Sequence, residues 1–230
     1  MLVDQQEMYK LIIFDWDGTL MDSEAKIVSC LQSAINSLKL EFRSDFLLKD
    51  VIGLGLTEAI LKLYPGLNEQ NIHLFIDEYR EQFLEKNTTK SQLFDGVSEM
   101  LNDLKQQEFL LAIATGKGRN GLDRILDVTK LNKIFDCSRC ADETLSKPNP
   151  LMLTEILNEL NISAQQSIMI GDTVYDLEMA NNIKMSTIAI THGVHSIDRL
   201  LTYQPRASVS NISELHHCLN NLNKLELISR

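Results

Sequence analysis

Short apolar runs alternate with segments of helical spacing through most of this chain. The first run, residues 11–14 (Leu-Ile-Ile-Phe), is continuously apolar and ends at Asp15, as expected for a strand buried on both faces. Comparable strand-like runs follow at residues 109–114, 134–140, 167–171 and 186–190. Apolar residues three and four apart predict helices over residues 97–104, 122–128, 151–160, 177–181 and 212–222. This alternation predicts an α/β fold, a doubly wound, Rossmann-like parallel sheet covered by helices on both faces.

Residues 23–88 interrupt the alternation, because every apolar pattern within them is helical. Ile27, Leu31 and Ile35 lie on one helical stripe. Further helices are predicted over residues 47–51, from an N-cap at Thr57 to Leu63, and over residues 74–83. We therefore predict an α/β core of residues 1–22 and 89–230 and a small all-helical domain, residues 23–88, inserted after the first strand.

Composition narrows the possible functions. The 32 acidic and 22 basic residues of the 230-residue chain give a formal net charge of −10. This balance argues against non-specific nucleic-acid binding, which depends on clustered cations, but it allows a small anionic substrate held by a few local ones. No apolar run is long enough to predict a membrane span, and Met1–Glu7 has no secretory pattern. Four scattered cysteines do not form a disulfide framework, so we expect a cytoplasmic protein.

Acidic side chains follow the strands at the edge where parallel α/β sheets bind ligands. Asp15 and Asp17 follow the first strand, and Asp172 and Asp176 follow the run at 167–171. Thr115 ends another strand, and Lys147 lies between these segments. Clustered carboxylates repel one another unless a cation lies among them, and oxygen ligands favour Mg²⁺. Each feature alone has a structural explanation as a turn or a helix cap, but their order along the chain favours a common site.

These segments resemble the four motifs of the haloacid dehalogenase superfamily. The family's Asp-x-Asp-Gly-Thr is residues 15–19, and its strand-ending Thr or Ser is Thr115. Its Lys-Pro is Lys147 with Pro148, and its Gly-Asp-x-x-x-Asp is residues 171–176. The resemblance spans nearly the whole chain and is strongest to the phosphoglycolate phosphatase branch. It implies that the helical insertion is a C1-type cap.

The resemblance also implies a mechanism. Asp15 would be the nucleophile that forms an aspartyl-phosphate, and Asp17 would be the acid for the leaving group and then the base for water. Catalytic and phosphate-binding roles would further fall to Thr115, Lys147 and the backbone near Gly18 and Gly116. The implied Mg²⁺ ligands are Asp15, the main-chain carbonyl of Asp17, Asp172 and, in support, Asp176.

The expected function is therefore Mg²⁺-dependent hydrolysis of a small phosphorylated metabolite, with phosphoglycolate as the first candidate. A sugar phosphomutase on the same core is an alternative, whereas a dehalogenase would not need Asp17 as an acid. Gly53 and Gly55, between two predicted helices, are candidates to contact the substrate from the cap. We expect a monomer or homodimer with no nucleic-acid or membrane partner.

Two other patterns allow different functions. Residues 116–121 match the Gly-x-Gly-x-x-Gly dinucleotide fingerprint, with Asp136 downstream, but follow a later strand than the fingerprint usually does. Cys137 and Cys140 have Cys-x-x-Cys spacing, but on a strand such positions face opposite ways, so we expect a structural role. His192 and His195 are interpreted as residues of a solvated loop, with a contact to the substrate or to the residues around it as the alternative.

Overall fold

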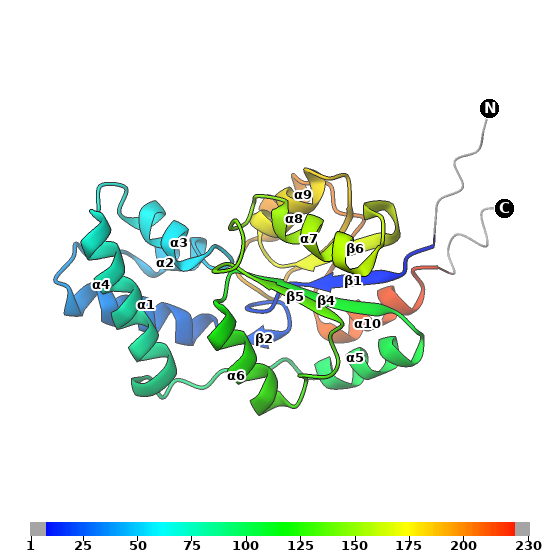
Figure 1. Ribbon diagram of the computed structural model, residues 1–230, viewed down its shortest axis with the longest axis horizontal. Coiled ribbons are helices and arrows are strands. Elements are labelled where there is room, and N and C mark those ends of the chain that lie inside the picture. The colour runs from blue at the N-terminus through cyan, green and yellow to red at the C-terminus, as the bar shows by residue number, and fades with distance from the viewer. Residues whose placement is uncertain (1–7, 224–230) are drawn as a thin grey trace.

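A six-stranded sheet lies at the centre of the computed structural model, which describes residues 8–223 (Figure 1). All neighbouring strands are parallel, in the order β5-β4-β1-β6-β7-β8. Their bounds are β1 Leu11–Phe14, β4 Leu110–Thr115, β5 Cys137–Cys140, β6 Ser167–Gly171, β7 Ser186–Ile190 and β8 Ala207–Val209. The predicted doubly wound α/β fold is confirmed. Met1–Glu7, where the sequence has no secretory pattern, lies outside the described residues.

Helices cover both faces of the sheet because successive side chains of each strand point to opposite faces. Ile12 and Phe14 of β1 pack in one apolar cluster with helices α5, α6 and α10. Leu11 and Ile13 pack in a second cluster with α7 and α8. Figure 1 shows these two groups of helices on opposite sides of the strands. The helices are α5 Val97–Gln106, α6 Arg119–Thr129, α7 Leu151–Leu160, α8 Val174–Asn181, α9 Ile197–Leu201 and α10 Ile212–Asn220.

The segment after the first strand is helical, as predicted, and has an apolar cluster of its own. It comprises α1 Glu24–Ser37, α2 Asp45–Asp50, α3 Leu56–Leu63 and α4 Glu69–Glu81, which continues into a π-helical turn, η1 Gln82–Lys86. Leu48, Ile60 and Phe75 are buried between these helices. Figure 1 shows the group at one end of the molecule, away from the two ends of the described chain. We refer to this group as the cap; its division from the core as a separate domain stays a prediction.

Several local predictions were wrong or incomplete. The N-cap of α3 is Gly55 rather than Thr57, which lies inside the helix. The predicted strand at 134–140 is shorter, because residues 134–136 precede β5. Three features were not predicted: α9, β8 and a two-residue antiparallel pair, β2 Met21–Asp22 with β3 Gln92–Leu93. This pair joins the two chain crossings between cap and core.

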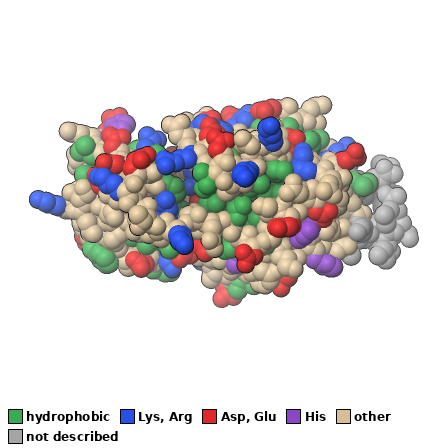
Figure 2. Space-filling model, turned by 90° about the horizontal axis from the view of Figure 1, so that it is seen from below, with side chains coloured by type: hydrophobic (Ala, Val, Ile, Leu, Met, Phe, Trp, Pro, Cys, Tyr) green, Lys and Arg blue, Asp and Glu red, His purple; other side chains and the backbone are tan. Residues whose placement is uncertain are grey.

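On the face that Figure 2 shows, Lys and Arg are interspersed with Asp and Glu. Within residues 8–223, no helix combines the length and apolar character needed to cross a membrane.

The central strands should dominate stability. Ile113 of β4 is wholly buried, whereas the side chain of Val128 on α6 is 70% exposed. We expect Ile113→Ala to lower the free energy of unfolding by about 2–5 kcal/mol, because it removes buried methyl groups and leaves a cavity. Val128→Ala should change it by less than about 0.5 kcal/mol. Urea titrations of both variants measure the difference; equal losses would contradict the assignment of Ile113 to the core.

Candidate active site

The predicted catalytic residues meet at the carboxyl edge of the sheet. Asp15 follows β1, Thr115 ends β4 and Asp172 follows β6. Because β1 pairs with β4 on one side and with β6 on the other, these three positions are neighbours across the sheet. All three side chains are buried.

Lys147 lies beneath this edge and forms two ion pairs. It comes from the segment between β5 and α7, and its Nζ lies 2.5 Å from Asp15 Oδ1 and 2.7 Å from Asp176 Oδ1. Burial by itself would lower the pKa of Lys147, but the charges of Asp15 and Asp176 outweigh it and raise the pKa above its usual value. Lys147 is therefore a fixed positive charge at neutral pH.

Three buried carboxylates form a cluster that suits a cation. Asp15, Asp172 and Asp176 each offer an oxygen, and these oxygens lie within 4.8 Å of one another. Asp15 Oδ2 has no hydrogen-bond partner among residues 8–223. Burial raises the pKa of Asp15 well above its usual value, and burial together with Asp176 raises that of Asp172 to about 7. When all three groups are ionised, one ammonium leaves negative charge without compensation, so these residues fit a divalent cation with oxygen ligands.

Hydrogen bonds hold Asp172 and Asp176 in place. Asp172 accepts one from Thr19 Oγ1 at 2.8 Å and one from the Val194 N–H at 2.8 Å. Asp176 belongs to a capping box at the start of α8 and accepts from Thr173 Oγ1 at 2.7 Å. These contacts fix the carboxylate positions in advance of ligand binding.

Gly18 leaves room for Asp172. Its φ is +83°, and a Cβ at this position would collide with the Asp172 carboxylate, so a larger residue is excluded. The N–H of Gly18 donates to the Met21 carbonyl at 2.8 Å. Packing against Asp172 thus explains why this residue is a glycine. A contact between its backbone and phosphate stays a prediction.

Asp17 has two partners of its own. Its Oδ1 accepts a hydrogen bond from Ser23 Oγ at 2.6 Å, and its Oδ2 lies 3.0 Å from Lys117 Nζ. Ser23 and Lys117 were not predicted as site residues. Lys117 lies two residues after the strand-ending Thr115, and this position alone could have indicated that it belongs to the site.

The cap reaches the site through the loop between α2 and α3. A Cβ on Gly116 would collide with the carbonyls of Gly53 and Leu54, so the backbones of cap and core are in close contact there. The N–H of Gly55 donates to Ser146 Oγ at 2.7 Å, next to Lys147. This places the predicted loop beside the predicted catalytic residues, whereas its effect on substrate choice stays a prediction.

A second group of contacts anchors the start of that loop to the core. The Asp50 carboxylate lies 2.6 Å from the guanidinium of Arg199 in the core, and within the cap it lies 2.8 Å from Lys62 Nζ of α3. The hydroxyl of Tyr175 donates to the Asp50 carbonyl at 2.6 Å. The interpretation of His195 as solvated was wrong: it is 3% exposed, its Nδ1 accepts from the Val174 N–H, and burial lowers its pKa to about 4.

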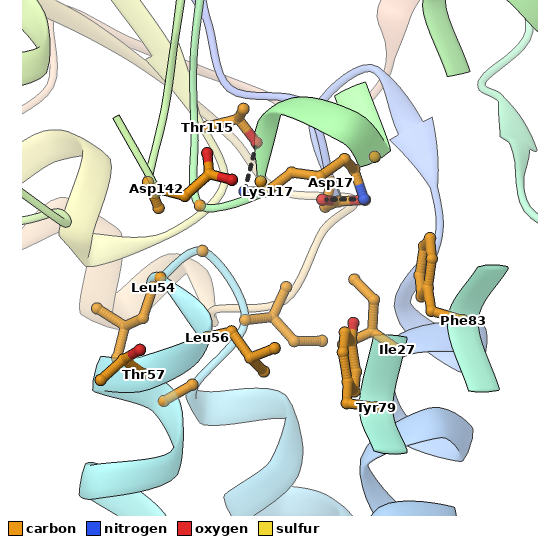
Figure 3. A pocket seen from close by; sticks show the side chains of 18 of the residues that line it. Asp17, Ile27, Leu54, Leu56, Thr57, Tyr79, Phe83, Thr115, Lys117 and Asp142 are labelled. Atoms are coloured by element: carbon orange, nitrogen blue, oxygen red, sulfur yellow. Dashed lines mark hydrogen bonds and ion pairs between the residues drawn. The ribbon is translucent and has the colours of Figure 1, made fainter. Parts of the chain in front are cut away.

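A cavity of about 430 Å³ lies between the α2–α3 loop, the helices of the cap and the carboxyl edge of the sheet. We refer to this edge, with the predicted catalytic residues, as the catalytic edge. Asp15, Asp17 and Thr115 line it from the core. Figure 3 shows Lys117 and Asp17 on the core side, with Tyr79 and Phe83 facing them from the cap. The volume suits a small-molecule ligand.

The dinucleotide fingerprint does not form a phosphate site at a helix start. The N–H of Arg119 at the start of α6 donates to both oxygens of Asp142, at 2.9 and 3.2 Å. An acidic side chain therefore occupies the position that a pyrophosphate would take. Cys137 and Cys140 belong to the apolar clusters on opposite faces of the sheet, which confirms that they point apart.

Comparison with known proteins agrees with this geometry. Residues 12–190 match the family model described as haloacid dehalogenase-like hydrolase. The chain is a member of this hydrolase family. A relative from Dickeya dadantii, named probable phosphatase IndB, is 32% identical over 222 residues, which cover 95% of this chain and 96% of the relative.

Two further similar proteins support the same family assignment. A pyrophosphatase PpaX from Listeria innocua is 29% identical over 210 residues, 89% of this chain and 93% of that protein. The crystal structure of a "predicted phosphatase" from Clostridium acetobutylicum superimposes with a TM-score of 0.84 at 28% identity, and covers 94% of this chain and all of the other.

Lys147 should contribute more to stability than a surface lysine does. Lys147→Met would leave Asp15 and Asp176 buried without compensation, and we expect it to lower the free energy of unfolding by about 3–5 kcal/mol. The matched control is Lys105→Met, which removes a half-exposed pair with Asp136 and should cost less than about 1 kcal/mol. Chemical denaturation of both variants provides the measurement, and a loss below about 1 kcal/mol at Lys147 would refute this account.

Proposed function

We propose that this hydrolase is a Mg²⁺-dependent phosphatase that cleaves a small phosphorylated metabolite through an aspartyl-phosphate on Asp15. The single observation that carries the proposal is the position of Asp15: one of its oxygens is paired with Lys147, and the other has no partner within residues 8–223 beside a cluster that fits a metal. The names of its relatives, probable phosphatase and pyrophosphatase, support phosphate chemistry. The resemblance at the sequence level makes phosphoglycolate the first compound to test.

In the first step, a carboxylate oxygen of Asp15 attacks phosphorus while the bond to the leaving oxygen breaks. Lys147 and Thr115 would hold the phosphoryl oxygens, aided by the backbone at Gly116. Asp15, Asp172 and the Asp17 carbonyl, with support from Asp176, would hold Mg²⁺, whose positive charge would reduce the repulsion between the Asp15 carboxylate and the phosphate. Phosphate monoesters react so slowly in water that the whole site must lower the barrier by roughly 20 kcal/mol.

Asp17 has the contacts expected of a group that moves protons. Its carboxylate, with Oδ2 3.0 Å from Lys117 Nζ, would take a proton from water as the aspartyl-phosphate is hydrolysed. In the first step Asp17 would give a proton to the leaving oxygen, and it would regain one from water in the second.

The test of the nucleophile is Asp15→Asn, since an amide keeps the volume of the side chain but is a far poorer nucleophile. We expect phosphate release to fall at least a thousandfold with the circular dichroism spectrum unchanged. Asp77→Asn, a position on α4 outside the cavity lining, is the matched control and should retain wild-type kcat. The assay uses p-nitrophenyl phosphate with Mg²⁺, and wild-type activity should be lost in EDTA and return with added Mg²⁺. A variant that retained a tenth of wild-type kcat would exclude Asp15 as the nucleophile.

The role of Asp17 is tested with leaving groups of different acidity. Asp17→Asn should lower kcat by about 10²–10⁴ for an alkyl phosphate, whose alkoxide needs a proton. The loss should be much smaller for formation of the aspartyl-phosphate from p-nitrophenyl phosphate, because nitrophenolate departs without one. The initial burst of nitrophenolate isolates this step. Equal losses for both substrates would show that Asp17 is not the acid.

A further inference from the structure

The cap-side wall of the cavity is apolar where the leaving group of a substrate would lie. A phosphoryl group at Asp15 and Thr115 places the rest of the ester toward the cap, since the cavity extends from these residues to α1, α3, α4 and η1. Half-buried apolar side chains line it there: Leu54, Leu56, Ile76, Tyr79, Phe83 and Leu84. Figure 3 shows Leu56, Tyr79 and Phe83 on this wall, opposite Lys117.

Charges in the cavity disfavour an anionic leaving group. Among the described residues that line it, Asp15, Asp17, Glu58 and Asp142 are acidic, and Lys117 and Arg80 are basic. Lys117 is paired with Asp17 and its Nζ lies 4.6 Å from the centre of the Phe83 ring, and Arg80 is exposed, so neither is a buried cation that is free to pair with an anion. A carboxylate or a second phosphate would lose its hydration there without a partner, which is costly.

We infer that the substrate is a phosphate monoester with an apolar alkyl or aryl leaving group. This inference rests on the proposed phosphatase function and names its substrate class. Tyr79 and Phe83 are stacked, with ring centroids 5.8 Å apart and an angle of 25° between the planes, and together with Leu54, Leu56, Ile76 and Leu84 they form an apolar surface. Contact with such a surface excludes water from the leaving group. Phosphoglycolate and inorganic pyrophosphate, whose leaving groups are charged, are then poor substrates.

A series of n-alkyl phosphates from methyl to hexyl tests the inference with the wild-type protein and Mg²⁺. The leaving alcohols differ little in acidity, so differences in kcat/KM report mainly on contact with the wall. Burial of one methylene group corresponds to about a three- to fourfold rise in kcat/KM, so we expect an increase of that size per carbon until the cavity is filled. An ω-carboxyalkyl phosphate of the same length should react at least tenfold more slowly than its alkyl counterpart.

Two substitutions in α3 test whether the apolar wall causes the rise in kcat/KM per carbon. Leu56→Asn places an amide in the wall and should reduce the rise per carbon to less than twofold. Leu61→Asn on the same helix is the control, because Leu61 is 39% exposed and lies outside the cavity; it should keep the wild-type slope. A reduced slope in both variants would overturn the assignment of the wall.

Other outcomes separate the inference from the function on which it rests. If kcat/KM does not depend on chain length, or carboxyalkyl phosphates react faster, the substrate class is wrong while the phosphatase function stands. A preference for carboxyalkyl phosphates that disappears in Arg80→Gln would identify Arg80 as the selecting group and overturn the inference in favour of anionic substrates. If neither p-nitrophenyl phosphate nor any ester of the series is hydrolysed, the proposed function fails, and the inference fails with it.

Discussion

The ammonium group of Lys147, buried among carboxylates, is the interaction on which the arrangement of the site depends. It lies between Asp15 and Asp176, which follow different strands of the sheet, and so holds two segments of the catalytic edge together. Without this charge, Asp15, Asp172 and Asp176 would repel one another in a region that water does not reach. One lysine does not balance three carboxylates, and this excess of negative charge makes the cluster suitable for a divalent cation.

Tight backbone packing around the carboxylates is the second requirement. Gly18 and Gly193 both lie so close to the Asp172 side chain that neither position has room for a Cβ. Asp172 is thereby enclosed by two loops, and Thr19 and Val194 from the same loops donate hydrogen bonds to it. The cluster is thus preorganised by hydrogen bonds and steric fit, and this is the condition under which a charged site can stabilise a transition state.

Cap and core are linked by contacts of two kinds. Near the catalytic edge the link is a close approach of backbones, at Gly116 and Gly53, with little side-chain chemistry. At the end of α2 it is polar, through the carboxylate of Asp50 and Arg199 of the core, and through the hydrogen bond from the Tyr175 hydroxyl to the Asp50 carbonyl. The apolar wall lies between the catalytic edge and the cap helices, so a substrate that fills it would contact both parts. In the proposed reaction the cap therefore contributes to recognition of the leaving group, while the reacting groups all come from the core.

The sequence by itself determined the sheet, the helical insertion and the residues at the catalytic edge. Strands buried on both faces are continuous apolar runs, and the residues that follow them must lie at one edge, so the amino-acid pattern alone placed Asp15, Thr115 and Asp172 there. Short and weakly patterned elements, such as β8 and the β2–β3 pair, could not be predicted, because they are stabilised by their neighbours rather than by local sequence. Only the tertiary structure decided which partner each charged group has: Lys117 with Asp17, Asp142 with the start of α6, and His195 in a buried site. These contacts join residues far apart in the chain, and neither periodicity nor motif spacing specifies them.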